Sequence, residues 1–323
     1  MRRIAVLTSG GDAPGMNACI RSVVRYGLAA GLQVYGVRQG YRGLIDNQIF
    51  PLDSRAVSGI LRAGGTILMS ARSQEFHTEA GQCRAIEVLR GWDIDGLVVI
   101  GGDGSLRGAL ELHRKGFPVV GVPASIDNDI ACTEMSIGVD TALNTILEAV
   151  DRIKDTAAAL QRAFVIEVMG RSHGYLALMA GIAGGAEMVV LPGTQVDRDK
   201  VVDEVRSAFL RGKPHFIIVA AEGASSAEKS ISQLLSEYVQ ASGHEVRTTV
   251  LGHVQRGGSP TCYDRLLGTR LGAAAVDCLL KGKSGVMVGI QSGEIAVTDL
   301  ETVLSAAPEL SKEALRLSEP LAH

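Results

Sequence analysis

The chain has 323 residues, of which 46% are hydrophobic and 21% charged, and its formal net charge at pH 7 is −3. This length and apolar content suffice for a large core and for more than one domain, while the near-neutral charge argues against a general nucleic-acid binder. No run approaches the roughly 20 apolar residues of a membrane span, and the N-terminal apolar stretch is too short for a signal peptide, so we expect a cytoplasmic protein with no membrane partner.

Short β-branched runs alternate along the chain with segments of helical period. The predicted strands lie, in chain order, at 4–7, 34–37, 97–100, 119–122, 164–168, 188–191 and 216–219. Helical spacing is present at 17–30 and 106–116, and Asp140 is expected to cap a further long helix. This alternation predicts parallel βαβ units covered by helices on both faces, with sites beyond the carboxyl ends of the strands. No linker composition marks a domain boundary, so we expect any crossing between domains at compact turns.

Glycine is the compositional anomaly. Several of the 39 glycines form GG pairs after apolar runs, and the glycines do not form a repeat. Such clusters are typical of loops that a ligand approaches closely, because glycine has no Cβ. The five cysteines are scattered and form no CxxC pair, which argues against a disulfide framework or a structural zinc site.

Two similar glycine loops follow predicted strands, in IAVLTSGGDAPG (4–15) and LVVIGGDGSLRG (97–108). Backbone N–H groups at such a strand-to-helix turn form an anion site. Asp103 would repel a bare phosphate, and a bound Mg²⁺ resolves the conflict because it takes carboxylate and phosphate oxygens together. The loop therefore favours a nucleotide polyphosphate with magnesium, and Gly11 fits a second phosphate approach. The alternative is a pair of tight turns in which Asp103 caps a helix. Neither GxxxxGK[ST] nor a proper GxGxxG is present.

Ser125, Asp127 and Asp129 follow the predicted strand at 119–122. Residues two apart in an extended stretch point the same way, so the two carboxylates could face one cleft. Phosphoryl transfer to a hydroxyl needs a group that accepts the hydroxyl proton, and Asp127 could be that base while Asp129 helps to hold magnesium. The alternative is a turn capped by Asx side chains.

Several arginines lie beside glycine turns or at the ends of predicted strands. Arginine binds phosphate through two parallel hydrogen bonds and stays charged, so the set is typical of phosphate handling. Its members, with one histidine, are Arg72, Arg162, Arg171, Arg247, His253 and Arg256. For each alone, a solvated surface arginine or a structural histidine is the simpler interpretation. Arg21 and Arg25 lie four apart on the polar face of the first helix, which is the pattern of a solvated face.

The ordered set of motifs resembles the bacterial ATP-dependent 6-phosphofructokinase family. The matching segments are TSGGDAPGMN, GGT (64–66), SAR (70–72), IGGDGS, SIDNDI, EVMGR, GIAGGAE (181–187) and VLGHVQRGGSPTCYDR, and they span nearly the whole chain. The resemblance implies transfer of the γ-phosphoryl of ATP to the 1-hydroxyl of fructose 6-phosphate. It also implies two Rossmann-like three-layer α/β domains with mostly parallel sheets.

By this resemblance the catalytic residues are Arg72, Ser125, Asp127 as the base, and Arg171, and the Mg²⁺ ligands are Asp103 and Asp129. The implied ATP-binding residues are Gly11, Tyr41, Arg72, Ser73, Gly102, Asp103, Gly104, Ser105 and Gly108. The implied sugar-phosphate residues are Ser125, Ile126, Asp127, Arg162, Met169, Gly170, Arg171, Glu222, Arg247, His253, Val254, Gln255 and Arg256.

In the family Arg162 and Arg247 reach in from a neighbouring subunit, which implies a homotetramer. The implied ATP-binding domain comprises 1–138 and 251–302, the sugar-phosphate domain 139–250, and the segment 303–323 packs back on the domains. The family's effectors, ADP and phosphoenolpyruvate, bind at an interface site. The matching residues are Arg21, Arg25, Lys154, Gly185, Glu187, Arg211, Lys213 and His215. Lys154, Ser54 and Gly59 stand where the family usually has Arg, Arg and Asp.

The phosphoryl donor depends on two positions. Relatives that use pyrophosphate typically carry Asp and Lys where this chain has Gly104 and Ala124, so both residues favour ATP. A pyrophosphate-dependent phosphofructokinase is the next candidate. A kinase of the NAD or diacylglycerol type shares a GGDG loop, but that class does not predict the other motifs. A non-catalytic sugar-phosphate sensor on the same fold is the alternative from a different class.

Overall fold

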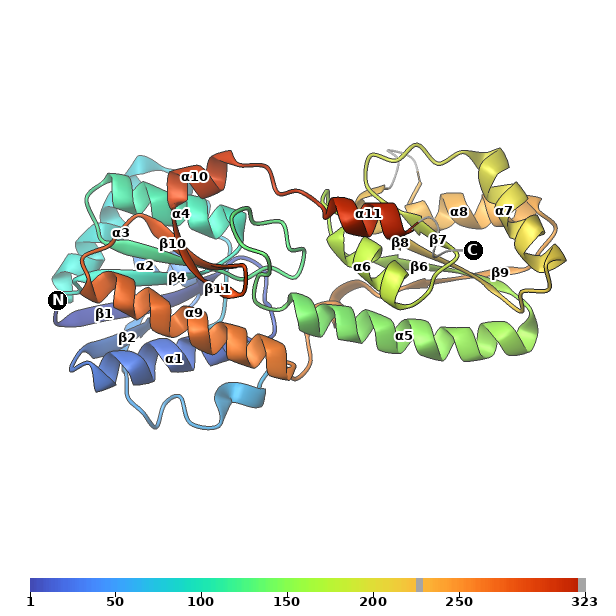
Figure 1. Ribbon diagram of the computed structural model, residues 1–323. Helices are drawn as coiled ribbons and strands as arrows, with labels where there is room; N and C mark the ends of the chain where they lie inside the picture. The colour runs from blue at the N-terminus through green and yellow to red at the C-terminus, as the bar shows by residue number, and fades with distance from the viewer. Residues whose placement is uncertain (225–228, 319–323) are drawn as a thin grey trace. The chain divides into compact units, whose positions relative to one another are not determined.

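The computed structural model describes residues 1–224 and 229–318 (Figure 1). The chain forms two compact units. One contains residues 1–141 and 256–308, and the other contains 142–255 and the described residues from Glu309 onward. The first boundary falls inside a helix, α5 (Val139–Leu160), and not at the compact turn that the sequence suggested.

The first unit is built on a seven-stranded sheet with the order β11-β10-β5-β4-β1-β2-β3. Its parallel strands are β1 (Arg3–Ser9), β2 (Gln33–Val37), β4 (Gly96–Gly101), β5 (Val119–Pro123) and β10 (Val286–Gln291). The edge strands β3 (Ile49–Leu52) and β11 (Glu294–Asp299) are antiparallel. The strand order runs in opposite directions from β1 and β4, which places a topological switch point between these two strands.

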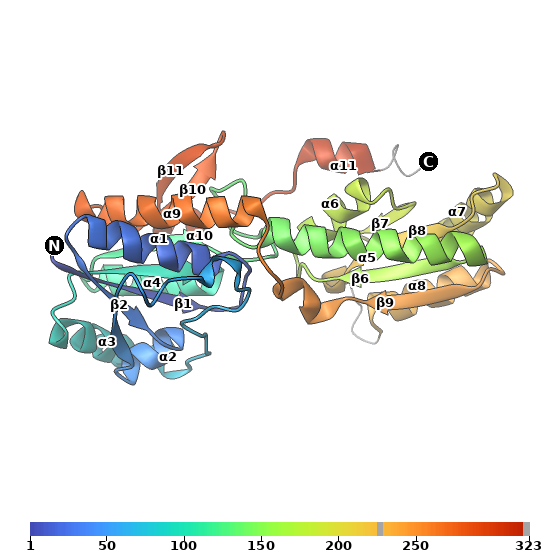
Figure 2. The same cartoon turned by 90° about the horizontal axis from the view of Figure 1, so that it is seen from below.

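Helices cover both faces of this sheet. The alternation of strand side chains sends Leu97 and Val99 into a core with α2 (Gly40–Ile45), α3 (Glu79–Gly91), α4 (Asp103–Arg114) and α10 (Leu300–Ser305). The other face is covered by α1 (Met16–Ala29) and α9 (Cys262–Leu280), which lie side by side (Figure 2). A Cβ on Gly268 or Gly272 of α9 would come within 2.7 Å of a backbone oxygen of Gly15 or Cys19, so glycine permits this close helix pair.

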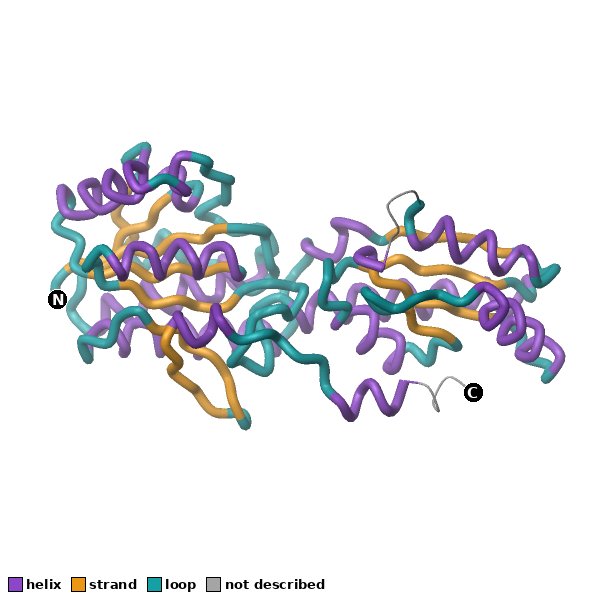
Figure 3. The backbone as a smooth tube through the Cα atoms, turned by 90° about the horizontal axis from the view of Figure 1, so that it is seen from above, coloured by secondary structure: helices purple, strands orange, loops and turns teal. Residues whose placement is uncertain are grey.

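The second unit has a fully parallel four-stranded sheet. Its strands are, in spatial order, β7 (Met188–Val190), β8 (Phe216–Ala221), β6 (Ala163–Val168) and β9 (Val246–Val250). Two helices, α7 (Arg198–Leu210) and α8 (Ile231–Ala241), share one core with this sheet. A third helix, α6 (Tyr175–Ala183), packs on β8, and α11 (Lys312–Ser318) packs on α6. Helices and strands are distinguished by colour in Figure 3.

The predicted α/β fold with mostly parallel sheets is confirmed, and each predicted strand is present. The sequence did not reveal β3, β9, β10 and β11. Three of these, β3, β9 and β11, are edge strands, whereas β10 is an interior strand whose apolar run VMVGI was not predicted to form one. None of the helices in the described ranges is long and apolar enough to cross a membrane.

The predicted cap of the long helix was wrong. Helix α5 begins at Val139, so Asp140 lies in its first turn and accepts a hydrogen bond from Thr261 Oγ1 at 2.6 Å. The carboxylate that caps the helix comes from Asp264, on α9, which is 0% exposed. It accepts from the backbone N–H groups of Gly138 and Thr141, both at 2.8 Å, and from Thr141 Oγ1. Burial raises the pKa of Asp264, while these hydrogen bonds oppose the rise.

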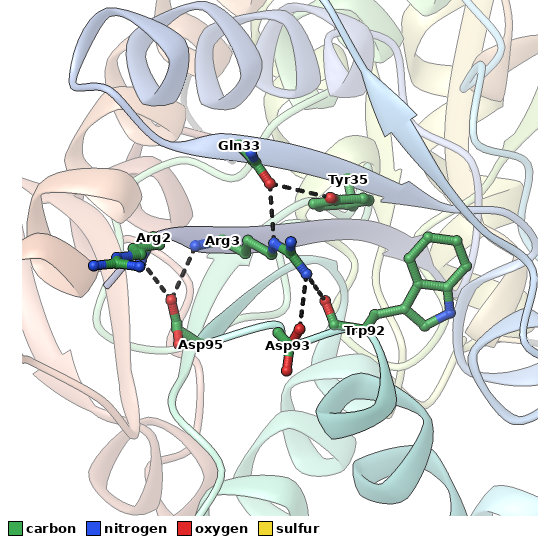
Figure 4. Close-up of polar contacts among 7 residues, drawn as sticks. All are labelled: Arg2, Arg3, Gln33, Tyr35, Trp92, Asp93 and Asp95. Carbon is green, nitrogen blue, oxygen red and sulfur yellow. Dashed lines mark hydrogen bonds and ion pairs between the residues drawn. The ribbon is translucent and has the colours of Figure 1, made fainter.

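A polar network closes the amino end of the first sheet (Figure 4). The carboxylate of Asp95 accepts from the backbone N–H groups of Arg2 and Arg3. These hydrogen bonds hold the pKa of Asp95 below its usual value. The Arg3 guanidinium contacts Asp93, Gln33 and the carbonyl of Trp92. Because the network fixes the start of β1 beside β4, it also fixes the register at the opposite end of the sheet.

The Asp264 cap generates a stability prediction. Replacing Asp264 with alanine removes three accepted hydrogen bonds and leaves buried N–H donors unsatisfied, so the free energy of unfolding should fall by about 2–4 kcal/mol. Urea denaturation measures this change. Asp277→Ala is the matched control, since Asp277 lies on the same helix and its carboxylate accepts a hydrogen bond from the exposed Tyr26 hydroxyl. Equal losses in the two variants would contradict the capping role.

Candidate active site

Three loops meet at the carboxyl ends of β1, β4 and β5. Parallel pairing sets Ser9 opposite Gly101 and Gly101 opposite Pro123, so the segments that follow these residues emerge side by side. They are the two glycine loops and the segment with Ser125, Asp127 and Asp129. This is the place that the sequence predicted for a site, at the switch point of the sheet.

The glycine loop after β4 leaves its backbone accessible. Helix α4 begins at Asp103, and its N-cap, Gly102, is extended. A Cβ on Gly104 would meet no atom within 4 Å, and one on Gly102 would come no nearer than 3.8 Å to any atom. Ser105 is buried under the loop. An open approach to the N–H groups at a helix N-terminus is the arrangement that binds a phosphate.

The aspartate segment after β5 is held by its own polar side chains. Ser125 Oγ donates to Asp129 Oδ1 at 2.8 Å, and Ser136 Oγ donates to the Ser125 carbonyl at 2.6 Å. Asn128 accepts from the Ser136 N–H at 2.9 Å and adopts a left-handed conformation with φ 48°. Asp127 is only 2% exposed, and Ile126 beside it is fully buried. A carboxylate fixed in a buried turn at a strand end is a candidate general base.

Asp103 and Asp129 fit the donor set of a magnesium site. Within the described ranges, no group of three or more His, Cys, Asp or Glu side chains could hold a metal. Mg²⁺ in phosphoryl-transfer sites is usually held by one or two carboxylates together with substrate phosphates and water. The Asp103 side chain is 46% exposed and therefore accessible to such an ion, although Arg107 contacts it in this structure.

Three predicted ATP residues have packing roles. A Cβ on Gly108 would come within 2.9 Å of the rings of Tyr41 and Phe76, which stack at 3.9 Å. Tyr41 is buried and donates to the Ser105 carbonyl at 2.6 Å, so it braces the glycine loop from beneath. Likewise a Cβ on Gly11 would collide with the Arg256 guanidinium, which also donates to the Asp12 carbonyl at 3.3 Å.

A polar cavity of about 330 Å³ lies beside α2 in the same unit. Two of its lining residues, Arg72 and Ser73, are among the predicted ATP residues, and Arg42 adds a second guanidinium. Arg42 was not predicted from the sequence, where its one signal is its position directly after Tyr41.

In the second unit another set gathers at the carboxyl ends of β6, β8 and β9. Gly170 and Arg171 turn sharply after β6, with φ of 134° and 44°. A Cβ on Gly223 would lie 1.6 Å from the Arg171 carbonyl oxygen, so the segment with Glu222 packs directly on this turn. Gln255, fully buried, accepts from the Met169 N–H at 3.2 Å and donates to the Gly252 carbonyl. His253 and Val254, in the same short helix (Gly252–Arg256), are exposed.

Arg162 and Arg247 lie at the other end of this sheet, just before β6 and at the start of β9. Both pair with Glu245, at 2.7 and 2.6 Å. They are therefore separated from Met169, Arg171 and Glu222 by the length of the strands. The structure does not bring the predicted sugar-phosphate residues of this chain into one cluster.

A second charged cluster lies at the amino ends of β7 and β8. The Glu187 carboxylate pairs with Lys213 at 3.3 Å and accepts from the Ile217 N–H, while Lys154 donates to the carbonyls of Gly184 and Gly185. Burial lowers the pKa of His215; Glu187 opposes this shift, and Lys154 and Lys213 add to it. Three cationic or protonatable side chains around one carboxylate favour an anion. Arg211 bonds Ser207 at the end of α7, and Arg21 and Arg25 lie on α1 of the first unit.

The chain matches the family model for phosphofructokinase over residues 3–279. It is 50% identical to ATP-dependent 6-phosphofructokinase of Brevibacillus brevis over 321 aligned residues. The alignment covers 99% of each chain. The chain belongs to the phosphofructokinase family. ATP-dependent 6-phosphofructokinase 1 of Thermus thermophilus is 52% identical over 324 residues, with full coverage of both chains.

Solved structures of the phosphofructokinase family share the fold. The structure of phosphofructokinase from Saccharomyces cerevisiae matches all of this chain with a TM-score of 0.88 and 36% identity, and the chain spans 48% of that protein's length. A pyrophosphate-dependent phosphofructokinase of Marinobacter aquaeolei, at 23% identity and a TM-score of 0.87, is similar in fold alone. The predicted family, kinase class and α/β architecture are confirmed.

Proposed function

We propose that the chain transfers the γ-phosphoryl of ATP to the 1-hydroxyl of fructose 6-phosphate, giving fructose 1,6-bisphosphate and ADP, as a cytoplasmic enzyme of glycolysis. The names of relatives about 50% identical over the full chain support ATP as donor and the sugar phosphate as acceptor. The observation that carries the proposal is the buried Asp127, in the segment that follows β5, next to the strand end from which the glycine loop of β4 leaves the sheet.

In this mechanism the Asp127 carboxylate accepts the proton of the sugar 1-hydroxyl. The hydroxyl oxygen bonds to the γ-phosphorus of ATP as the bond between that phosphorus and the ADP oxygen breaks. The backbone of 102–105 binds the polyphosphate. Ser125, Arg72 and Arg171 stabilise charge on the transferred group. When bound, Mg²⁺ held by Asp103 and Asp129 would neutralise charge on the nucleotide. The second-unit set of Met169, Glu222, Gln255 and His253 would bind the sugar phosphate.

The environment of Gly104 and Ala124 supports ATP over pyrophosphate. Open space beside Gly104 leaves room for a nucleotide. Pyrophosphate lacks a nucleoside, and relatives that use it typically carry a lysine at the position of Ala124. Ala124 is 1% exposed and provides no such charge. A pyrophosphate-dependent enzyme and a non-catalytic sugar-phosphate sensor are the competing functions.

Product formation with each donor tests the reaction. Wild type with Mg²⁺ and fructose 6-phosphate should turn over with ATP and not with pyrophosphate. Asp127→Asn keeps the shape but cannot accept the proton, so kcat should fall by about 10²–10⁴-fold. Asp277→Asn is the control, because Asp277 lies near the C-terminal end of α9 and its carboxylate contacts a surface tyrosine hydroxyl, that of Tyr26. Turnover with pyrophosphate would reverse the donor assignment, and no turnover with either donor would favour the sensor.

We also propose that the enzyme is a homotetramer with shared sites. Arg162 and Arg247 lie at the strand ends opposite Met169 and Glu222, an arrangement that suits residues offered to a neighbouring subunit. A site completed in this way can be tested by complementation.

Mixing two inactive variants provides that test. Asp127→Asn and Arg162→Ala subunits, each weak alone, should regain activity when they are dissociated together and reassembled. In a randomly mixed assembly, some sites combine an intact Asp127 with an intact Arg162 from a neighbour. Reassembly of each variant by itself is the control. If mixing restores nothing although mixed oligomers form, both residues belong to the site of one subunit.

We further propose an effector site for the anions ADP and phosphoenolpyruvate, built from the cluster of Lys154, Glu187, Lys213 and His215. Gly185 and Arg211 lie beside this cluster along the chain. Arg21 and Arg25 would join it from a neighbouring subunit in the tetramer.

The lowered pKa of His215 gives this effector site a pH dependence. The imidazole is mainly neutral near pH 8, and a bound anion favours its protonated form, so anion binding should tighten as the pH falls toward about 6. Titration calorimetry with phosphoenolpyruvate at both pH values measures the effect. We expect His215→Gln to reduce the tightening by about 3- to 10-fold relative to wild type. An unchanged pH dependence would exclude His215 from the site.

A further inference from the structure

Arg107 makes a contact that the proposed reaction does not explain. It lies one turn after Asp103 on α4, and its guanidinium contacts both carboxylate oxygens, with Nε to Oδ2 at 2.8 Å and a terminal nitrogen to Oδ1 at 3.3 Å. Asp103 is the carboxylate proposed to hold magnesium. The same two oxygens therefore have two possible cationic partners, the guanidinium and the metal.

The guanidinium also has a second acceptor. A terminal nitrogen of Arg107 lies 3.5 Å from the carbonyl oxygen of Leu304, in the last turn of α10. The last carbonyls of a helix lack intrahelical partners and carry partial negative charge, so they attract a cation. Both side chains of the ion pair are about half exposed, at 60% for Arg107 and 46% for Asp103. Arg107 can thus release Asp103 and keep a favourable contact.

We propose that Arg107 is a positioning residue that competes with Mg²⁺ for Asp103. In the metal-free site the guanidinium neutralises the carboxylate, which otherwise repels the nucleotide phosphates. When the metal–nucleotide binds, the ion takes the place of the guanidinium at the carboxylate, and Arg107 keeps its contact with the Leu304 carbonyl. Arg107 therefore narrows the difference in affinity between metal-free and metal-bound nucleotide. This inference rests on the proposed function of the glycine loop as the ATP site.

The competition predicts opposite changes in two affinities. In Arg107→Gln, metal-free nucleotide meets an unneutralised Asp103 and should bind more weakly, whereas the Mg²⁺ complex meets no competitor and should bind more tightly. An exposed ion pair is weak, so we expect each affinity to change by about two- to fivefold. If Arg107 instead bound the phosphates directly, its loss would weaken both forms together.

Titration calorimetry with a non-hydrolysable ATP analogue, with and without Mg²⁺, measures both affinities without turnover. Arg107→Lys should stay near wild type because it keeps the charge. Arg114→Gln is the matched control, since Arg114 lies two turns further on α4 and pairs with Glu111 and Glu301. Thermal unfolding of each variant checks that it is folded.

The outcomes separate this inference from the proposed function. Divergence of the two affinities in Arg107→Gln alone supports the competition. A parallel loss of both, or affinities equal to those of the control, overturns the competition while leaving the kinase function intact. If wild type binds the analogue in neither form, the ATP site itself is wrong and the competition falls with it.

Discussion

Parallel pairing of β1, β4 and β5 is the constraint on which the functional architecture of the first unit depends. With Ser9, Gly101 and Pro123 in register, the two glycine loops and the aspartate segment must leave the sheet at the same edge. The amino ends of β1 and β4 are fixed by Asp95, whose carboxylate holds the first backbone N–H groups of the chain. A slip of one residue would turn the buried side chains to the wrong face, so the core itself protects the geometry of the site.

Glycine has two different purposes in this site. At Gly102 and Gly104 the space beside the backbone is open, as a phosphate site requires. At Gly108 and Gly11 that space is filled by the Tyr41 and Phe76 rings or by the Arg256 guanidinium. One motif thus combines positions that serve a ligand with positions that let supporting side chains approach the loop. Substitutions at Gly102 or Gly104 should reduce activity by blocking the ligand, whereas substitutions at Gly108 or Gly11 should do so by displacing the supporting side chains.

In the second unit, the two ends of the parallel sheet carry different sets of charged residues. Residues of this unit that are proposed to act on the sugar phosphate follow the strands of the sheet, whereas Arg162, Arg247 and the Glu187 cluster lie where the strands begin. A parallel sheet has one edge of strand ends and one of strand beginnings, and so offers two separate polar surfaces. That separation is consistent with assigning one edge to catalysis and the other to neighbouring subunits and effectors.

The sequence alone determined seven of the strands, the α/β class, the phosphofructokinase family and the glycine and aspartate motifs, because apolar period and motif order are local properties. It could not determine the cap of α5, which comes from Asp264, more than 120 residues further along the chain. Nor could it reveal that Gly108 is required by Tyr41, that Arg162 shares Glu245 with Arg247, or that Arg107 also reaches Leu304. These are contacts between segments far apart in the chain, and only the packing of helices on the sheets decides which distant side chains meet.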